Sequence, residues 1–119
     1  IWATDIMTFT PFSAWEASGT SFMKAGVNGV PSVASRDGAV AEVVRDGYNG
    51  WLFGEDRRKL LPPDSQDVNS REYQEFKNKV EEALDALANG KYWTVAFNAL
   101  KTFEGYYSMD RLFRDYGYI

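Results

Sequence analysis

The sequence predicts an α/β protein with a small parallel sheet, and two features of its first fifty residues indicate this fold class. Short runs of β-branched and aromatic residues alternate with stretches of helical character. Glycine, proline, asparagine and aspartate separate these runs, as turns require. A strand, helix, strand, helix, strand order within about fifty residues is typical of parallel α/β sheets.

Each predicted strand is short and mostly apolar. We expect a mostly buried strand at Ile1–Thr10, which Pro11 ends, and further strands at Val30–Ala34 and at Trp51–Phe53. Helices are expected between them, at Gly19–Val27, which Asn28-Gly29 ends, and at Ala39–Arg45. Residues 1–54 therefore form the strand–helix repeats of the predicted domain, and they include the loop that follows its first strand.

A polar connector at residues 55–68 leads into a longer predicted helix. This helix is expected to run from Asn69 or Ser70 to about Ala88, with Ser70 as its N-cap. Its apolar stripe comprises Tyr73, Phe76, Val80, Leu84 and Leu87. The spacing of three or four residues indicates an amphipathic helix that packs on the sheet.

Two further helices are predicted, at Lys91–Phe103 and at Met109–Tyr116. In the first of them we expect Trp93, Phe97, Leu100 and Phe103 to point inward. Residues 69–119 are assigned to the same domain as residues 1–54, as its C-terminal helices.

Three parallel strands do not make a complete α/β domain, because all-parallel sheets are normally buried on both faces. We therefore expect either further strands from a larger protein or self-association through an exposed sheet edge. The N-terminus opens into a strand pattern at Ile1–Met7 without a basic region, so a signal peptide is not expected. The sequence thus predicts a part cut from a longer chain.

Composition excludes several classes of function. The 119 residues fit one domain, and 45% apolar with 25% charged residues are ordinary for a globular protein. A net charge of −4 with scattered cations argues against a nucleic-acid partner, and no run approaches the roughly 20 apolar residues of a membrane span. Without cysteine or histidine, the chain can supply neither disulfides, thiolate metal sites nor histidine acid–base chemistry. A cytoplasmic location is expected.

The stretch Trp15–Lys24 carries the chemistry that the residues themselves suggest. A loop ends where a helix is predicted to begin, and unpaired N–H groups there suit an anion such as phosphate. Gly19 allows close approach of the backbone, Ser18 and Thr20 add hydroxyl groups, and Glu16 can accept hydrogen bonds from a sugar. Lys24 follows one helical turn beyond Thr20. The alternative is that Ser18 or Thr20 only caps the helix and that Lys24 is solvated.

Other acidic residues do not form a site in the sequence. Asp37, Glu42 and Asp46 lack metal-ligand spacing, so we predict no metal and expect solvated turn residues.

The run Glu-Ala-Ser-Gly-Thr-Ser-Phe-Met-Lys at Glu16–Lys24, followed by Asn28-Gly29, resembles the segment around the pyridoxal-phosphate lysine of the α-glucan (glycogen or maltodextrin) phosphorylases. Asp37-Gly38 with Glu42 resembles a second element of that family. The likeness spans nearly the whole chain, and Glu16–Lys24 is its specific part. It implies the C-terminal part of a GT-B fold, with a Rossmann-like parallel sheet, flanking helices and a C-terminal helical extension.

The resemblance also implies roles. Lys24 would anchor pyridoxal phosphate, and Thr20 and Ser21 would hold the cofactor phosphate. Glu16, Ala17, Ser18 and Gly19 would orient the glucosyl unit that passes from the α-glucan to phosphate, which gives glucose 1-phosphate. The family commonly has glycine at the position of Ser21 or Phe22. The remaining catalytic groups belong to the N-terminal half of such an enzyme, so we predict no catalytic residue here beyond cofactor positioning and no activity of this chain alone.

Two other functions stay open. Retaining glycosyltransferases of the glycogen-synthase type are similar at Gly29–Ser35 and Glu42–Phe53. Their second glutamate is replaced here by Lys24, whose ammonium group cannot accept hydrogen bonds from a sugar nucleotide. Lysine can instead hold pyridoxal phosphate, which favours the phosphorylase. The third possibility is a non-catalytic interaction module that uses the exposed sheet edge and the aromatic C-terminal helices.

Overall fold

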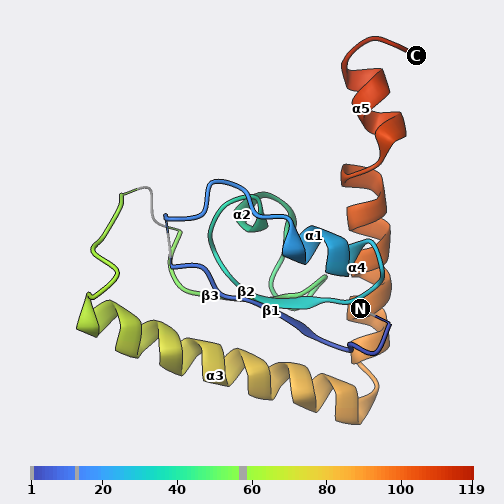
Figure 1. The fold of residues 1–119 in the computed structure, drawn as a ribbon. Coiled ribbons are helices and arrows are strands. Elements are labelled where there is room, and N and C mark those ends of the chain that lie inside the picture. The colour runs from blue at the N-terminus through green and yellow to red at the C-terminus, as the bar shows by residue number, and fades with distance from the viewer. Residues whose placement is uncertain (1, 13, 57–58) are drawn as a thin grey trace.

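A computed structural model of the chain describes residues 2–12, 14–56 and 59–119. Its strands are β1 (Met7–Phe9), β2 (Ser32–Ser35) and β3 (Trp51–Phe53). Its helices are α1 (Ser21–Gly26), α2 (Val40–Val43), α3 (Gln66–Asn89), α4 (Tyr92–Tyr106) and α5 (Met109–Asp115), as Figure 1 shows. Ile1, in the first predicted strand, and Arg57 and Arg58, in the connector, lie outside the described residues.

The three strands form one parallel sheet in the order β1-β2-β3, as the sequence predicts. The first strand is shorter than the predicted Ile1–Thr10, because, of its described residues, only Met7–Phe9 pairs with β2, and of these residues only Phe9 is buried. The central strand β2 pairs Val33 with Thr8 on one side and with Trp51 on the other. All four residues of β2 are buried. The outer edge of β1 pairs with no other strand within the described residues.

Helices cover both faces of the sheet (Figure 1). Successive strand residues point to opposite faces, so Val33 and Ala34 belong to different apolar clusters. The cluster beneath α1 and α2 comprises Phe9, Phe22, Ala34, Val40, Val43, Val44, Leu52 and Phe103. The cluster against α3 and the first turns of α4 comprises Val33, Trp51, Phe53, Ala83, Ala86, Tyr92, Val95 and Ala96. Burying each large apolar side chain contributes about 1.5–3 kcal/mol, so the two clusters stabilise the layered arrangement.

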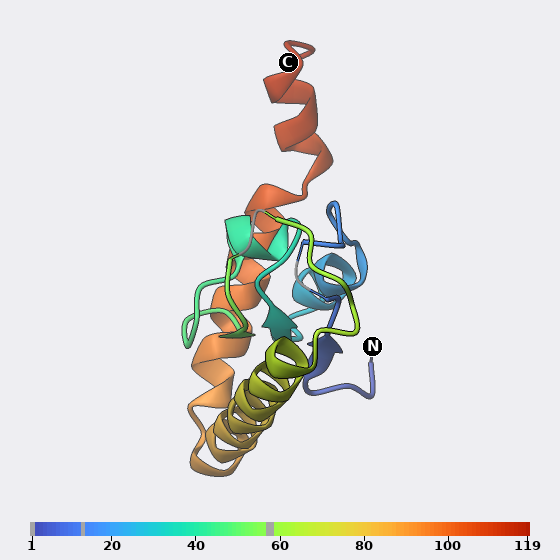
Figure 2. The ribbon, with the colours of Figure 1, turned by 90° about the vertical axis from the view of Figure 1, so that its left-hand side faces the viewer.

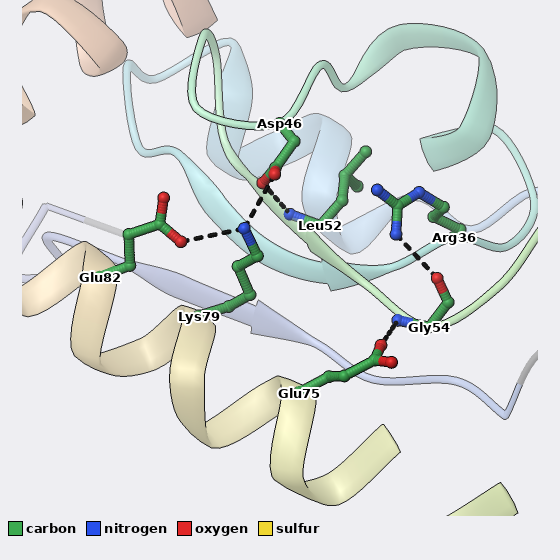
Figure 3. Close-up of polar contacts among 7 residues, drawn as sticks. All are labelled: Arg36, Asp46, Leu52, Gly54, Glu75, Lys79 and Glu82. Atoms are coloured by element: carbon green, nitrogen blue, oxygen red, sulfur yellow. Dashed lines mark hydrogen bonds and ion pairs between the residues drawn. The ribbon is translucent and has the colours of Figure 1, made fainter. Parts of the chain in front are cut away.

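Polar contacts fasten β3 to α3, as Figure 3 shows. The Glu75 carboxylate accepts the N–H of Gly54, with an N···O distance of 2.7 Å. The Lys79 ammonium lies 2.8 Å from an oxygen of Asp46 and 2.9 Å from one of Glu82. The other oxygen of Asp46 accepts the N–H of Leu52 at 2.9 Å. These contacts hold the short strand at its middle residue, Leu52, and just beyond its end, at Gly54.

Helix α3 differs from its prediction at its start and on part of its buried face. It begins at Gln66 with Ser65 at the N-cap position, so the predicted N-cap Ser70 is wrong. Of the predicted stripe, Phe76, Val80 and Leu87 do pack against the core, whereas Tyr73 and Leu84 are exposed. Ala83 and Ala86 are buried instead, because small side chains allow the helix axis to approach the sheet closely.

Helix α4 turns a different side from the predicted one toward the core, where it packs against α1 and α3. Trp93 is 74% exposed and Phe97 is 63% exposed, and Leu100 is exposed too, so their predicted inward orientation is wrong. Only Phe103 of that set is buried. The buried side consists of Tyr92, Val95, Ala96, Ala99 and Phe103. Alanines again replace the larger side chains at the closest approach.

The remaining helices are shorter than predicted or stand apart. Helices α1 and α2 lie inside their predicted ranges. Helix α5 contributes no buried residue and extends away from the body of the domain (Figure 2). Its first turn is capped by Ser108, whose hydroxyl accepts the N–H of Arg111. Within the described ranges, no helix has both the length and the apolar character that crossing a membrane demands.

Candidate functional site

The loop that carries the predicted site leaves the sheet after β1 and leads into α1 (Figure 1). The turn at residues 37–39 follows β2 at the same edge of the sheet, because the strands are parallel. In open α/β sheets, ligands bind outside the carboxyl ends of the strands. The position of the loop therefore agrees with that of a ligand site.

A buried carboxylate holds the main chain of this loop. Asp37 is only 6% exposed. One of its oxygens accepts the N–H of Glu16 at 2.8 Å and the other accepts the N–H of Gly38 at 3.0 Å. The N–H of Ala39 donates to the carbonyl oxygen of Ser18 at 3.0 Å. The expectation that Asp37 is a solvated turn residue is therefore wrong.

Two glycines allow the loop to pack this closely. Gly38 has a φ of +54°, and a Cβ at this position would overlap the carbonyl group of Ser18. Gly19 has a φ of +84°, and a Cβ there would lie 2.5 Å from the ring of Phe9. The main chain of the loop is thus enclosed between an aromatic ring of the core and the turn that follows β2.

The two ends of the loop region have additional anchors. The hydroxyl of Ser35 donates to the carbonyl oxygen of Pro11 at 2.8 Å. The indole N–H of Trp15 donates to the carbonyl oxygen of Leu61 at 2.8 Å, which brings the connector against the loop. The loop is therefore held by β2, by the turn after β2 and by the connector.

The side chains of the predicted site residues lie at the surface of this fixed main chain. Ala17, Ser18, Thr20, Ser21 and Lys24 are exposed, and Glu16 and Gly19 are half-buried. Thr20 occupies the N-cap position of α1 without a side-chain capping bond. The alternative that its hydroxyl caps the helix is wrong, and within the described residues this hydroxyl has no protein partner.

Phe22 turns away from this surface. It is fully buried, and its ring centroid lies 5.2 Å from that of Phe9 and 5.8 Å from that of Phe103. The rings of Phe9 and Phe22 are tilted to each other, and those of Phe22 and Phe103 meet edge to face, an arrangement that aromatic pairs favour. Phe22 is one of the two positions at which the resembling family commonly has glycine. Because its ring is buried, it does not cover the exposed hydroxyl groups of Thr20 and Ser21 or the amine of Lys24. The donors of Thr20, Ser21 and Lys24 fit a cofactor that carries a phosphate.

A cavity of about 470 Å³ lies at a different place, between β1, the connector and α3. Its walls include Thr8 and Thr10 of the β1 region and Tyr73 and Phe76 of α3. None of the predicted site residues lines it. We assign the candidate site to the loop because it combines hydroxyl groups and a carboxylate with the amine of Lys24. The described walls of the cavity also carry hydroxyl groups but contain no amine.

The sequence analysis overlooked Asp37 as part of the site. A signal was present, because Asp37-Gly38 directly follows a buried strand and matches the second element of the family resemblance. Trp51 is buried as well, at 2% exposure, and belongs to the core. Hydrogen bonds to main-chain N–H groups, rather than burial, therefore distinguish Asp37 from a residue that only packs.

The arrangement defines a fold class: an α/β fold with part of a Rossmann-like, GT-B-type parallel sheet. HepE of Anabaena, whose crystal structure was solved in complex with UDP, superimposes with a TM-score of 0.69 at 24% sequence identity. The superposition covers 95% of this chain and 26% of HepE. It confirms the predicted fold class.

Sequence comparison identifies the family. Residues 1–116 match the carbohydrate phosphorylases, and the chain belongs to this family. It is 31% identical to maltodextrin phosphorylase of Thermococcus litoralis over 115 residues, which cover 94% of this chain and 13% of that enzyme. It is 29% identical to the brain form of human glycogen phosphorylase over 90 residues, or 74% of this chain and 11% of that enzyme. The chain thus spans about an eighth of the length of these relatives.

Proposed function

We propose that this chain is the C-terminal, cofactor-bearing part of a cytoplasmic α-1,4-glucan phosphorylase. The enzyme would transfer a glucosyl unit from glycogen or maltodextrin to phosphate and release glucose 1-phosphate. The observation that carries the proposal is the run Glu16–Lys24, whose polar groups are displayed on a main chain held by Asp37. Membership of the carbohydrate phosphorylase family supports it.

Within this site, Lys24 would hold pyridoxal phosphate through its amine, and Thr20 and Ser21 would bind the cofactor phosphate. The exposure of all three side chains supports this assignment. When bound, the cofactor would supply a phosphate group able to exchange a proton with the attacking phosphate. The chain's own residues would position the reactants rather than react with them.

The loop at residues 16–19 would orient the glucosyl unit. The Glu16 carboxylate can accept hydrogen bonds from sugar hydroxyls, and the Ser18 hydroxyl can donate or accept them. The N–H of Ala17 has no acceptor within the described part of the chain, so it is available to a ligand. Fixed donors of this kind lower the cost of ordering a substrate.

The proposal includes a partner, the N-terminal half of the same enzyme. The unpaired edge of β1 offers main-chain groups to a further strand. Other phosphorylase groups, histidine among them, would come from that half, since this chain contains no histidine. We therefore expect the chain by itself to show no phosphorolysis. Self-association through the same edge is the alternative use of this surface.

A sugar-nucleotide glycosyltransferase of the glycogen-synthase type is the second candidate. The fold likeness to HepE and the run Glu42–Phe53 favour it. Lys24 argues against it, because an ammonium group donates hydrogen bonds and accepts none. A non-catalytic module is the third candidate.

Cofactor trapping tests the proposal. Purified full-length protein is incubated with pyridoxal phosphate and reduced with borohydride, and the modified lysine is located by peptide mass spectrometry. We expect the label on Lys24, its loss in Lys24→Arg, and its retention in Lys101→Arg, where another exposed lysine is replaced. Equal labelling of several lysines would contradict the proposal.

Thermal unfolding in the presence of ligands separates the other candidates. If UDP-glucose raises the unfolding temperature and pyridoxal phosphate does not, the protein is a sugar-nucleotide transferase. If neither ligand changes it, the interaction module gains support.

A further inference from the structure

We propose that Asp37 is a positioning residue for the candidate site. Its buried carboxylate fixes the main chain at Glu16 and thereby sets how the side chains of residues 16–18 face a ligand. The ligand's identity rests on the proposed function. The hydrogen bond between Asp37 and the N–H of Glu16 does not depend on that function.

Both oxygens of Asp37 are used by main-chain N–H groups. One binds the N–H of Glu16 in the loop, 21 residues earlier in the sequence, and the other binds the N–H of Gly38. No lysine or arginine among the described residues forms an ion pair with Asp37. A buried carboxylate is costly unless it is hydrogen-bonded, so its charge is compensated here by these N–H groups.

A second hydrogen bond holds the loop two residues further on, and we call the two bonds together the clamp. The N–H of Ala39 holds the carbonyl oxygen of Ser18, two residues beyond Glu16. Gly38 lies between Asp37 and Ala39, and because it has no side chain, the loop can approach it closely. The main chain is therefore held at residues 16 and 18, while Ala17 between them is exposed. This geometry presents the Ala17 N–H and the flanking side chains in a fixed orientation.

Asp46 offers a matched control. It also precedes a glycine and also accepts a main-chain N–H, that of Leu52. Its second oxygen binds Lys79, and its contacts lie at β3 and α3 rather than at the loop. Replacing Asp46 by alanine therefore removes a comparable carboxylate-to-main-chain hydrogen bond, that to Leu52, without touching the loop at residues 16–18.

The test measures hydrogen exchange and cofactor uptake in full-length protein with Asp37→Ala and Asp46→Ala. We expect the Glu16 amide to exchange about ten-fold faster in Asp37→Ala and to be unchanged in Asp46→Ala, because the first variant removes its acceptor. The concentration of pyridoxal phosphate needed for half-maximal trapping on Lys24 should rise about five-fold or more in Asp37→Ala alone, because the loop loses its fixed orientation.

Unchanged Glu16 exchange in Asp37→Ala overturns the inference, and so does equal weakening of cofactor trapping in both variants. If Asp37→Ala does not fold, the wild-type protein decides the question: the inference requires strong protection of the Glu16 amide beside a rapidly exchanging Ala17 amide. If the wild-type protein traps no cofactor, the proposed function fails, and the exchange measurements still decide whether Asp37 holds the loop.

Discussion

The dipeptide Asp-Gly occurs twice within eleven residues of this chain, at Asp37-Gly38 and at Asp46-Gly47. Both glycines have a positive φ, +54° and +74°. The space around them differs. A Cβ at Gly38 would overlap the main chain of Ser18, whereas nothing lies within 4 Å of a Cβ at Gly47. One turn is packed under a loop, and the other faces solvent.

The two aspartates differ in the same way. Asp37 is almost fully buried, and within the described part of the chain it binds only main-chain N–H groups. The side chain of Asp46 is 35% exposed, and it divides its oxygens between the N–H of Leu52 and the ammonium of Lys79. The same dipeptide can therefore hold a loop or form a surface ion pair. Which of the two it does depends on the segments of the chain that pack against it.

Replacing the two glycines should give the largest difference between the turns. Gly38→Ala combines a strained φ with overlap against Ser18, so we expect a loss of about 2–5 kcal/mol in the free energy of unfolding. Gly47→Ala carries only the backbone cost, about 1–2 kcal/mol. Urea unfolding of both variants checks this. Equal losses would show that the Gly38 turn is not packed against the loop.

Removing the ammonium group tests the Asp46 turn by itself. Lys79→Met keeps the apolar stem and deletes the ion pairs with Asp46 and Glu82. We expect a loss of about 0.5–1 kcal/mol, because partly exposed ion pairs contribute little. In 1 M NaCl the difference between wild type and variant should shrink, since salt screens these charges. A loss comparable to that of Gly38→Ala would mean that the Asp46 turn is the stronger anchor.

The smallest effect concerns alkaline pH. Burial alone would lower the pKa of Lys79, but its hydrogen bonds with Asp46 and Glu82 and their charges outweigh burial, so the pKa lies above the usual 10.5. Because the folded pKa is raised, the stabilisation is complete below pH 10.5 and is lost as the pH rises through the folded value. From neutral pH upward, the stability difference between wild type and Lys79→Met should therefore stay constant and then decline.

The alkaline measurement needs the variant as its reference, because two tyrosines act in the same direction. Burial, together with nearby carboxylates, raises the pKa of Tyr92 and of Tyr107. Both groups reduce stability at high pH in wild type and variant alike. If the difference between the two proteins does not decline above pH 10.5, Lys79 is not paired with Asp46 in solution.

Much of the fold could be predicted from local pattern. The strand Trp51–Phe53 has the predicted bounds, and the parallel sheet follows from the alternation of strands and helices. The orientation of the long helices could not be predicted in this way. Large apolar residues such as Trp93 and Phe97 indicated the wrong face of α4, because smaller residues, alanines among them, make up much of its buried side. Local pattern shows that a helix is amphipathic but not which apolar residues its neighbours have room for.

The candidate site was predictable only in part. The run Glu16–Lys24 is contiguous, so its motif could be found without knowledge of the fold. The contribution of Asp37 depends on a hydrogen bond to Glu16 across 21 residues, and the same dipeptide at Asp46 makes no such bond. The assigned roles of Lys24 and of the loop residues stay predictions until cofactor trapping is done.

The clamp also determines which positions tolerate redesign. Asp37 and Ala39 form hydrogen bonds with main-chain atoms of Glu16 and Ser18. These bonds do not involve the side chains at the two positions. Saturation mutagenesis of positions 16–18 should accordingly yield proteins whose loop keeps its main-chain shape while its side chains vary. Proline at position 16 is the one residue that the clamp rejects outright, because it has no N–H to donate.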